Sequence, residues 1–445
     1  MASQQAQQLK KVLKPIHLWA IAVSLVISGE YVGWNLGWGV SGTVGFLIAT
    51  VIITVMYVTF VFSYTELTTS IPHAGGAFAY AYHAMGPFGA LVAGYATVID
   101  LMFATPVIAS GLGSYIHFLY PGIPVIPCAM TFYLIFMGLN ISGVKESAVF
   151  SIVVAMLAIA ELLLFMGVIA PSFKIHTFLT DSMPFGWGGV FAALPFAIWF
   201  YLAIEGVAMV AEEVKEPKKD IPKGYISGIV TLVFLAFGVM ILSGGITNWK
   251  NLSKIDYPLP EAIGIVLGKT NGLTKMFAGI GLFGLIASFH GTILAYSRQL
   301  FAMARSGYLP GFLSAVNKKF NTPHWAIIAG GVIGCIAILT GTTDQILVLS
   351  VLGAVVMYLM SMLSLFILRI RQPHMERPFA APFYPVFPGV ALLIAVVSLF
   401  AIIWYNPVLS LLFLGGLILT LALFILLKKH KAAVPEDLMS VTIDI

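Results

Sequence analysis

Long runs of apolar residues follow one another along most of the chain, and short polar stretches separate them. Each run is about as long as the ~20-residue helix that crosses the ~30 Å hydrocarbon layer of a bilayer. The runs are continuous and do not alternate with a period of two, so they exclude a transmembrane β-barrel. The pattern predicts an all-α integral membrane protein with about 12 transmembrane helices. We expect these helices at residues 16–38, 42–68, 88–118, 123–142, 147–171, 187–211, 223–245, 275–304, 325–341, 346–369, 384–405 and 407–427.

The composition is typical of a chain that is solvated mainly by lipid. Of its 445 residues, 60% are hydrophobic and only 9% are charged, and the mean hydropathy is +0.99. A soluble domain would carry roughly 25% charged residues. The polar start, Met1–Leu9, does not resemble a cleaved signal peptide, so we expect the first apolar run to stay in the membrane. Cys128 and Cys335 lie inside apolar runs, which indicates small buried side chains and no disulfide, metal site or cofactor.

The basic residues predict the orientation of the helices. An even number of crossings places both termini on one side, and lysine and arginine are enriched on the cytoplasmic side. With both termini in the cytoplasm, at 1–15 and 428–445, most of the 23 lysines and arginines lie there. The formal charge of +5 is therefore a topological signal, and it does not indicate a nucleic-acid partner. The basic residues expected outside are Lys174, Lys250, Lys254, Lys269 and Lys275.

Four acids and one histidine lie deep inside the predicted helices: Glu30, Asp100, Glu161, Glu205 and His290. A carboxylate at the bilayer centre costs roughly 2.5–3.5 kcal/mol on insertion scales, so each one calls for a reason. No lysine or arginine lies at comparable depth in these helices. The missing positive charge is therefore expected to come from a cationic substrate, from protons or from Na⁺. The alternative for each acid is a protonated group that holds two helices together, and for His290 a hydrogen-bonded packing role.

Two of the predicted helices contain interruptions. In the first, glycines at 29, 33 and 37 surround Glu30 and Asn35, and in the sixth Pro195 precedes the pair Glu205–Gly206. Interrupted helices in corresponding positions, first and sixth, are typical of an inverted-repeat transporter with its site near the bilayer midplane. Close helix packing through the glycines is the alternative reading of the first interruption.

Four segments in order resemble the amino acid–polyamine–organocation (APC) superfamily of transporters. They are Pro72–Tyr80 ("P-x-x-G-G…Y"), Asn140–Ser147 ("N-x-x-G-V-K-x-S"), Ala211–Pro222 ("A-E-E-V-K-x-P…I-P") and Ser297–Pro310. The resemblance implies alternating access and ten core helices as a five-plus-five inverted repeat, at 16–171 and 187–369. It also implies two further helices, at 384–427. A multi-pass protein of a bacterial cytoplasmic (inner) membrane is expected, as a monomer or a loose homo-oligomer.

The first helix departs from the amino-acid permeases of that superfamily. Their G-S-G or G-A-G break binds the substrate carboxylate, whereas the matching triplet here is Gly33-Trp34-Asn35. Ala158 matches a helix-5 lysine of proton-coupled bacterial members, and Glu161 follows one turn later. The stretch Ser28–Asn35 resembles the "S-G-[DE]-Y-x-G-W-N" segment of bacterial ethanolamine permeases. Ethanolamine carries an ammonium group and no carboxylate, which agrees with the unbalanced acids.

These observations predict a secondary active transporter that imports a small cationic amine, most directly ethanolamine. We expect Glu30 and Glu205 to frame the ammonium group, aromatic rings to close around it, and Asn35 or an unwound backbone carbonyl to hold the hydroxyl. The expected substrate residues are Glu30, Tyr31, Gly33, Trp34, Asn35, Trp199, Phe200, Tyr201 and Glu205. The expected coupling residues are Asp100, Glu161 and His290, with H⁺ as the coupling ion and Na⁺ as the alternative.

The sequence is also compatible with several other functions. An amino-acid permease with a reshaped carboxylate site and a polyamine transporter both belong to the same superfamily. A membrane sensor or light subunit that does not transport is a third alternative, although no signalling domain or partner cysteine in a loop is recognisable. A membrane enzyme is the least favoured, because the sequence contains no nucleophile–base spacing, metal-ligand cluster or nucleotide-binding loop.

Overall fold

The computed structural model describes residues 11–143, 148–340 and 342–428, and its elements there are helices, joined at one point by a single-residue β-bridge. The outer parts of the predicted tails, and the Val144–Ser147 end of one motif with its Lys145, lie outside the described residues. The helices are α1 (Pro15–Val26), α2 (Ser28–Tyr31), η1 (Trp34–Gly37), α3 (Trp38–Ser70), α4 (Ala77–Leu119), α5 (Val125–Ile141), α6 (Ala148–Ile169), η2 (Ala170–Ser172), α7 (Ile175–Leu179), α8 (Gly186–Trp199), η3 (Ile204–Glu213), α9 (Pro217–Gly244), η4 (Trp249–Asn251), α10 (Pro258–Leu267), α11 (Gly272–Arg305), η5 (Gly311–Ser314), α12 (His324–Leu339), α13 (Thr343–Arg371), α14 (Val386–Tyr405) and α15 (Pro407–Lys428).

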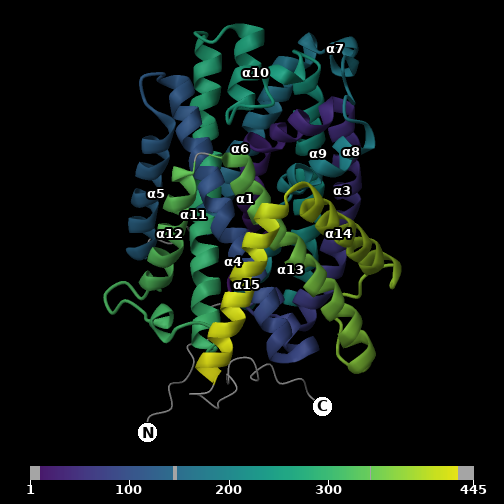
Figure 1. Ribbon diagram of the computed structural model, residues 1–445, viewed down its shortest axis with the longest axis vertical. Coiled ribbons are helices and arrows are strands. Elements are labelled where there is room, and N and C mark those ends of the chain that lie inside the picture. The colour runs from purple at the N-terminus through teal and green to yellow at the C-terminus, as the bar shows by residue number, and fades with distance from the viewer. Residues whose placement is uncertain (1–10, 144–147, 341, 429–445) are drawn as a thin grey trace.

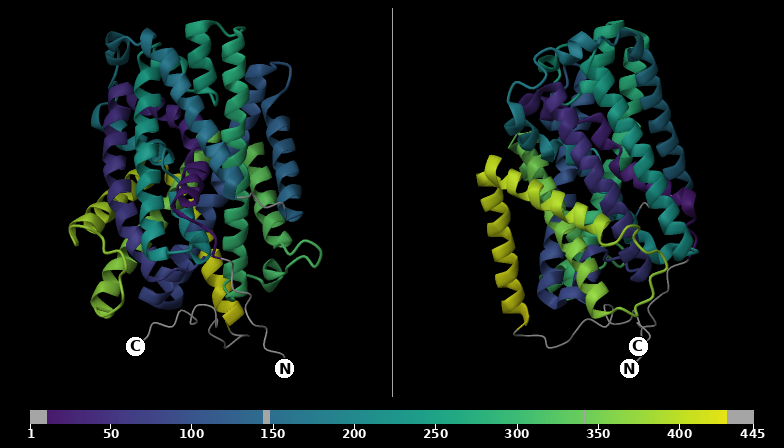
Figure 2. Two further views of the ribbon diagram at one scale, coloured as in Figure 1. Left: turned by 180° about the vertical axis from the view of Figure 1, so that it is seen from behind. Right: turned by 90° about the vertical axis from the view of Figure 1, so that its right-hand side faces the viewer.

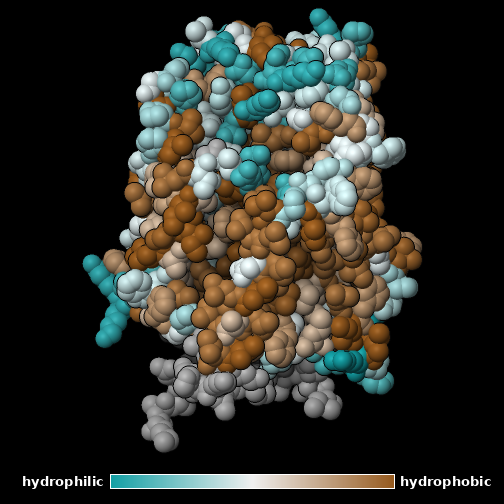
Figure 3. Space-filling view, viewed as in Figure 1, coloured by the Kyte–Doolittle hydropathy of each residue, from teal (hydrophilic) through white to brown (hydrophobic). Residues whose placement is uncertain are grey.

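The prediction of an all-α multi-pass membrane protein is confirmed. In the described part of the chain, nine helices are long and apolar enough to cross a membrane, and four shorter apolar helices accompany them. Three of the shorter ones supply the remaining predicted crossings, and the fourth, α10, packs at one end of the bundle (Figure 1). On the face drawn in Figure 3, apolar side chains form a broad band, and hydrophilic ones gather above it. Such a surface is unfavourable in water and suits contact with lipid tails.

The predicted first helix is divided into several short pieces. α1 and α2 lead to Gly33, whose φ of +93° ends the helix, and η1 then continues into α3. A second glycine, Gly42 at φ +72°, kinks α3 and separates the end of the first crossing from the start of the second. A side chain rarely adopts these left-handed conformations, so glycine is the residue that allows both turns.

The predicted sixth helix is interrupted, but not at the expected residues. Pro195 lies within α8, and the helix breaks after Trp199, where Ala203 adopts the left-handed conformation with φ 75° before η3 begins. The first and sixth helices are therefore both discontinuous within the bundle, and α8 packs beside α3 (Figures 1 and 2).

One end of the bundle is fastened by contacts between segments that are distant in sequence. The backbone of Leu13 pairs with that of Val214, directly after η3. The backbone amide of Ala74 donates to the carboxylate of Glu212 over 2.8 Å, which joins two of the recognised motifs. Nearby, Glu66 of α3 forms ion pairs with two arginines at and after the end of α13. The first and sixth helices thus share one closed end.

Candidate functional site

The two helix breaks lie directly against each other. The indole N–H of Trp199 donates to the backbone carbonyl of Val32 over 2.8 Å. A Cβ added to Gly29 would lie 2.4 Å from the carbonyl oxygen of Trp199, and one added to Gly33 would lie 2.6 Å from its Nε1. Both approaches are closer than real Cβ contacts, so these two glycines allow the breaks to meet. The close-packing reading and the broken-helix reading of this stretch are therefore both correct.

Glu30 lies at the first break and is completely buried, with an exposed fraction of 0%. Neither carboxylate oxygen has a hydrogen-bond partner among the described residues. The backbone carbonyl of the same residue accepts the indole N–H of Trp34 over 3.0 Å, so only the side chain lacks a partner. A buried carboxylate without a partner is costly unless a proton or a cation joins it. The Glu30 carboxylate is therefore a candidate binding site for a proton or a cationic ligand.

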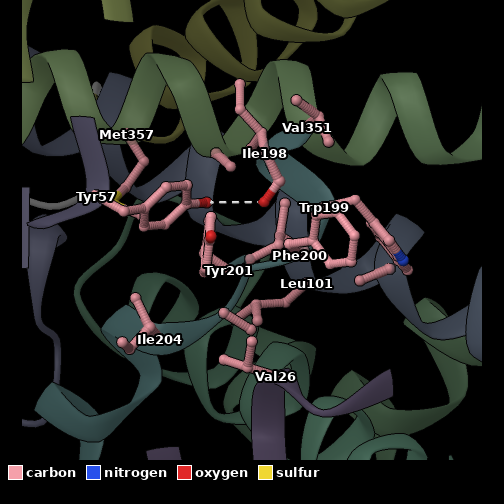
Figure 4. Packing of buried hydrophobic residues seen from close by; sticks show 14 of the residues in the cluster. Val26, Tyr57, Leu101, Ile198, Trp199, Phe200, Tyr201, Ile204, Val351 and Met357 are labelled. Carbon is pink, nitrogen blue, oxygen red and sulfur yellow. Dashed lines mark hydrogen bonds between the residues drawn. The ribbon is translucent and has the colours of Figure 1, made fainter. Parts of the chain in front are cut away.

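Aromatic rings surround the two breaks, as the sequence predicts. Trp34 stacks on Phe200 with 5.7 Å between ring centroids and meets Trp38 edge-on at 4.8 Å. Tyr201 hydrogen bonds through its hydroxyl to Thr54 over 2.7 Å. Figure 4 shows Trp199, Phe200 and Tyr201 side by side at the sixth-helix break, packed among apolar residues. These rings come together from α8, the break after it, and η1.

A small cavity separates the first and sixth helices from α4 and α11. Its volume is about 10 Å³, which is room for roughly one water molecule. The structure is thus closed around the breaks, and larger ligands would require the helices to move apart. Sequence reasoning missed several residues here, because a small or apolar residue in an apolar helix gives no signal of its own. The cavity is lined by Leu25, Val26, Ser28, Ala104, Ile108, Trp199, Leu202, Ala203 and Thr292.

Asn35 is directed away from this cluster, in contrast to the expectation that it holds a substrate hydroxyl. Its amide nitrogen donates to the carbonyls of Leu252 and Ile255 over 2.6 and 2.8 Å, which ties the first helix to the loop before α10. The next loop residue, Asp256, accepts the hydroxyl of Thr343 over 2.9 Å. Burial raises the pKa of the Asp256 carboxyl above its ordinary value, and that hydrogen bond partly opposes the rise. Asn35 therefore links the first helix to the loop before α10, at the end of the bundle opposite to Leu13.

Glu205 does not lie with Glu30, in contrast to the expectation that the two acids frame one ammonium group. Its carboxyl group interacts with that of Asp100 on α4. The hydroxyl of Tyr358 on α13 donates to Glu205 Oε2 over 3.3 Å. The structure therefore combines a predicted substrate residue with a predicted coupling residue in a second buried cluster.

The two remaining coupling candidates have separate surroundings. Glu161 on α6 accepts the hydroxyl of Tyr31 over 2.7 Å, which places both beside the first-helix break. His290 on α11 hydrogen bonds through Nδ1 to the amide of Asn140 over 3.0 Å. This contact suits the hydrogen-bonded packing role considered from the sequence.

The comparisons with known proteins identify this arrangement. The amino acid permease family matches residues 13–427, almost the whole described part of the chain. The chain belongs to the amino acid permease family. It is a transporter of the APC superfamily, as the four motif segments indicate, and not an enzyme of the membrane.

Several relatives of this permease match over most of their length. An uncharacterized transporter of Rhizobium meliloti (strain 1021) is 30% identical over 413 residues, which cover 89% of this chain and 87% of the relative. The branched-chain amino acid permease BcaP of Bacillus subtilis (strain 168) is 27% identical over 407 residues and covers 83% of each chain. The methylthioribose transporter of the same organism is 29% identical over 354 residues, covering 74% of this chain and 75% of its own.

Proposed function

We propose that this protein is a permease for a small solute with an ammonium group, that Glu30 is the counter-ion of that group, and that amino acids are the principal class. The observation that carries the proposal is the buried Glu30 carboxylate, which has no hydrogen-bond partner in the described part of the chain and lies at the first-helix break. A charge-assisted hydrogen bond from an ammonium group contributes about 1.5–3 kcal/mol. The rings of Trp34 and Phe200 beside it suit a desolvated cation.

The family supports amino acids as the substrate. The matching family is described by amino acid transport, and one relative is named for branched-chain amino acids. Every free amino acid carries the ammonium group that Glu30 requires. A relative of similar identity is named for methylthioribose. Family membership therefore does not determine the substrate, and the choice among substrates has to be argued from the chemistry of the binding site.

Ethanolamine is the second candidate, and two observations favour it. The triplet at the break is Gly33-Trp34-Asn35, and Trp199 packs against Gly33, so the break departs from the small-residue triplet that holds a substrate carboxylate in the amino-acid permeases that the sequence resembles. The acids around the breaks would also repel a substrate carboxylate, whereas an amine without one adds only positive charge.

Uptake into proteoliposomes tests both candidates. Labelled leucine and labelled ethanolamine are offered separately to reconstituted protein, with excess alanine or putrescine as competitor and protein-free liposomes as the control. Leucine uptake that alanine blocks supports an amino-acid permease, and ethanolamine uptake that resists alanine supports an amine carrier. Inhibition by putrescine alone indicates a polyamine substrate. No saturable uptake of any of these by folded protein refutes the proposal.

Protons are the coupling ion that we propose, because the interior of the bundle holds carboxyl groups on α2, α4, α6 and η3. Uptake that a protonophore abolishes and that does not require Na⁺ supports this assignment. Uptake that requires Na⁺ and survives the protonophore contradicts it. We also propose that both termini face the cytoplasm of a bacterial inner membrane, which single cysteines at exposed loop positions and an impermeant reagent would test.

A further inference from the structure

Two acids that the sequence places 105 positions apart form one buried pair. Asp100 comes from α4 and Glu205 from η3, with exposed fractions of 0% and 2%, and their carboxyl groups are close enough to interact. Asp100 Oδ2 and Glu205 Oε1 have no hydrogen-bond partner among the described residues. Two carboxylates offer only acceptors, so a hydrogen bond between them needs a proton. Two neighbouring acids in a buried site also disfavour the state in which both are ionised. Burial of both groups therefore favours a pair that keeps one proton.

A chain of phenol hydroxyls connects this pair to the sixth-helix break. The hydroxyl oxygens of Tyr358 and Tyr57 lie 2.7 Å apart. Beyond them, Tyr358 lies 3.3 Å from Glu205 Oε2, and Tyr57 lies 3.3 Å from the carbonyl oxygen of Ile198. Figure 4 shows this last contact as a dashed line to the end of α8. The chain thus runs from an acid to the backbone residue that precedes Trp199.

Each phenol has a single proton, so the chain has two possible directions. When Glu205 Oε2 is unprotonated, Tyr358 donates its hydroxyl proton to Oε2 and Tyr57 donates to Tyr358. The Ile198 carbonyl then receives no hydrogen bond from Tyr57. With a second proton on Oε2, Glu205 donates to Tyr358, Tyr358 donates to Tyr57, and Tyr57 donates to Ile198. Both end contacts are 3.3 Å, longer than a typical O–H···O bond, so the structure does not select one direction of the chain.

We propose that Asp100 and Glu205 form a proton-binding site, and that a second proton taken up on Glu205 reverses the Tyr358–Tyr57 chain and fastens the Ile198 carbonyl at the sixth-helix break. Proton binding at one end of the chain then changes the hydrogen bonding of the break that packs against Glu30. The role of this switch in transport rests on the proposed permease function. The proton-binding site does not rest on that function, because its residues and contacts are defined without a substrate.

The surroundings of the pair suit a proton site. The hydroxyl of Ser350 lies 3.4 Å from Asp100 Oδ1, so it donates only weakly. The titratable side chains around the pair are tyrosines from three helices: Tyr57 and Tyr64 of α3, Tyr225 of α9 and Tyr358 of α13. Within the described residues, no group of three or more His, Cys, Asp and Glu side chains is arranged to hold a metal ion.

Infrared spectroscopy of the purified protein without substrate tests the site. We expect a carboxylic-acid band at neutral pH that is lost in Asp100→Asn and in Glu205→Gln, because the new amide donates an N–H in place of the shared proton. Glu376→Gln, which changes an exposed acid, is the matched control and should keep the band. The idea is overturned if neither buried substitution removes intensity, or if Na⁺ removes the band from the wild-type protein.

Hydrogen–deuterium exchange tests the chain of phenols. The peptide that covers residues 196–206 is compared at mildly acidic and mildly alkaline pH, with rates corrected by an unstructured peptide. We expect slower exchange in acid for the wild type, and loss of this pH response in Tyr57→Phe. Tyr64→Phe is the control, because Tyr64 lies near Glu205 without belonging to the chain, and it should keep the response. An unchanged response in Tyr57→Phe refutes the switch. Neither measurement uses a substrate, so its outcome is separate from that of the uptake experiment.

Discussion

The substitution Glu30→Gln is expected to stabilise the ligand-free protein while it weakens substrate binding. Glutamine preserves the size of the side chain and removes the charge. In the structure this charge is fully buried, and its two oxygens lack hydrogen-bond partners among the residues described. An unsatisfied buried polar group costs about 1–3 kcal/mol, and more when it is charged. Glutamine leaves a neutral group that is also unpaired, so the gain is the difference between a charged and a neutral buried group. The free energy of unfolding should therefore rise by about 1 kcal/mol.

The effect on the substrate has the opposite sign. Loss of a charge-assisted hydrogen bond costs about 1.5–3 kcal/mol. At about 1.4 kcal/mol for each tenfold change, the dissociation constant should increase roughly tenfold to somewhat more than a hundredfold. Thermal unfolding in detergent measures the first effect, and equilibrium binding of the transported solute measures the second.

A gain in stability together with a loss of substrate affinity distinguishes a ligand-binding acid from a structural one. A structural acid that is protonated and holds two helices together would lose stability in Glu30→Gln and leave affinity unchanged, and that result would refute the reasoning. Glu161→Gln is the matched control. Its carboxylate already accepts the hydroxyl of Tyr31, and glutamine retains an acceptor there, so a smaller gain in stability is expected.

Three further predictions concern the framework around the site. Glu66→Ala leaves two arginines without their buried carboxylate, so the free energy of unfolding should fall by about 3–5 kcal/mol in a thermal assay, and an unchanged value contradicts this. Gly33→Ala places a methyl group against Trp199 at a φ of +93°, so uptake should be lost while the protein still reaches the membrane. Cysteines at Leu13 and Val214, whose backbones pair, should cross-link on oxidation and block uptake until a reductant is added, whereas either single cysteine should not.

The fold was predictable because helix length and hydropathy are local properties. Each predicted crossing contains a helix, and Gly33 marks the first break, since a glycine in an apolar helix next to an acid carries a recognisable signal. The sixth break was displaced by several residues. Pro195 sits within α8 without breaking it, while the left-handed residue is Ala203, a type that favours helix and gives no warning.

The composition of the site was predictable, but the pairing of its members was not. Each step along a helix turns the side chain by about 100°, so a sequence gives the depth of an acid better than the face on which it lies. Glu30 and Glu205 were expected together because each lies near a break. Contacts between distant segments decide otherwise: Glu205 meets Asp100, and Asn35 reaches the loop before α10. A single sequence carries no record of such contacts.

The two buried clusters make similar contacts between a broken helix and the last helix of its predicted repeat. In the first predicted repeat, Tyr31 at the break of helix one hydrogen bonds to Glu161 on α6, the fifth crossing. In the second, Glu205 after the break of helix six hydrogen bonds to Tyr358 on α13, the tenth crossing. Each broken helix is thus joined to the last helix of its own repeat by a phenol and a carboxyl group, with donor and acceptor exchanged. The second cluster adds Asp100 of α4, whereas Glu30 beside the first has no hydrogen-bond partner for either carboxylate oxygen in the described chain. This difference is why we propose a proton site at the second cluster and a substrate cation site at the first.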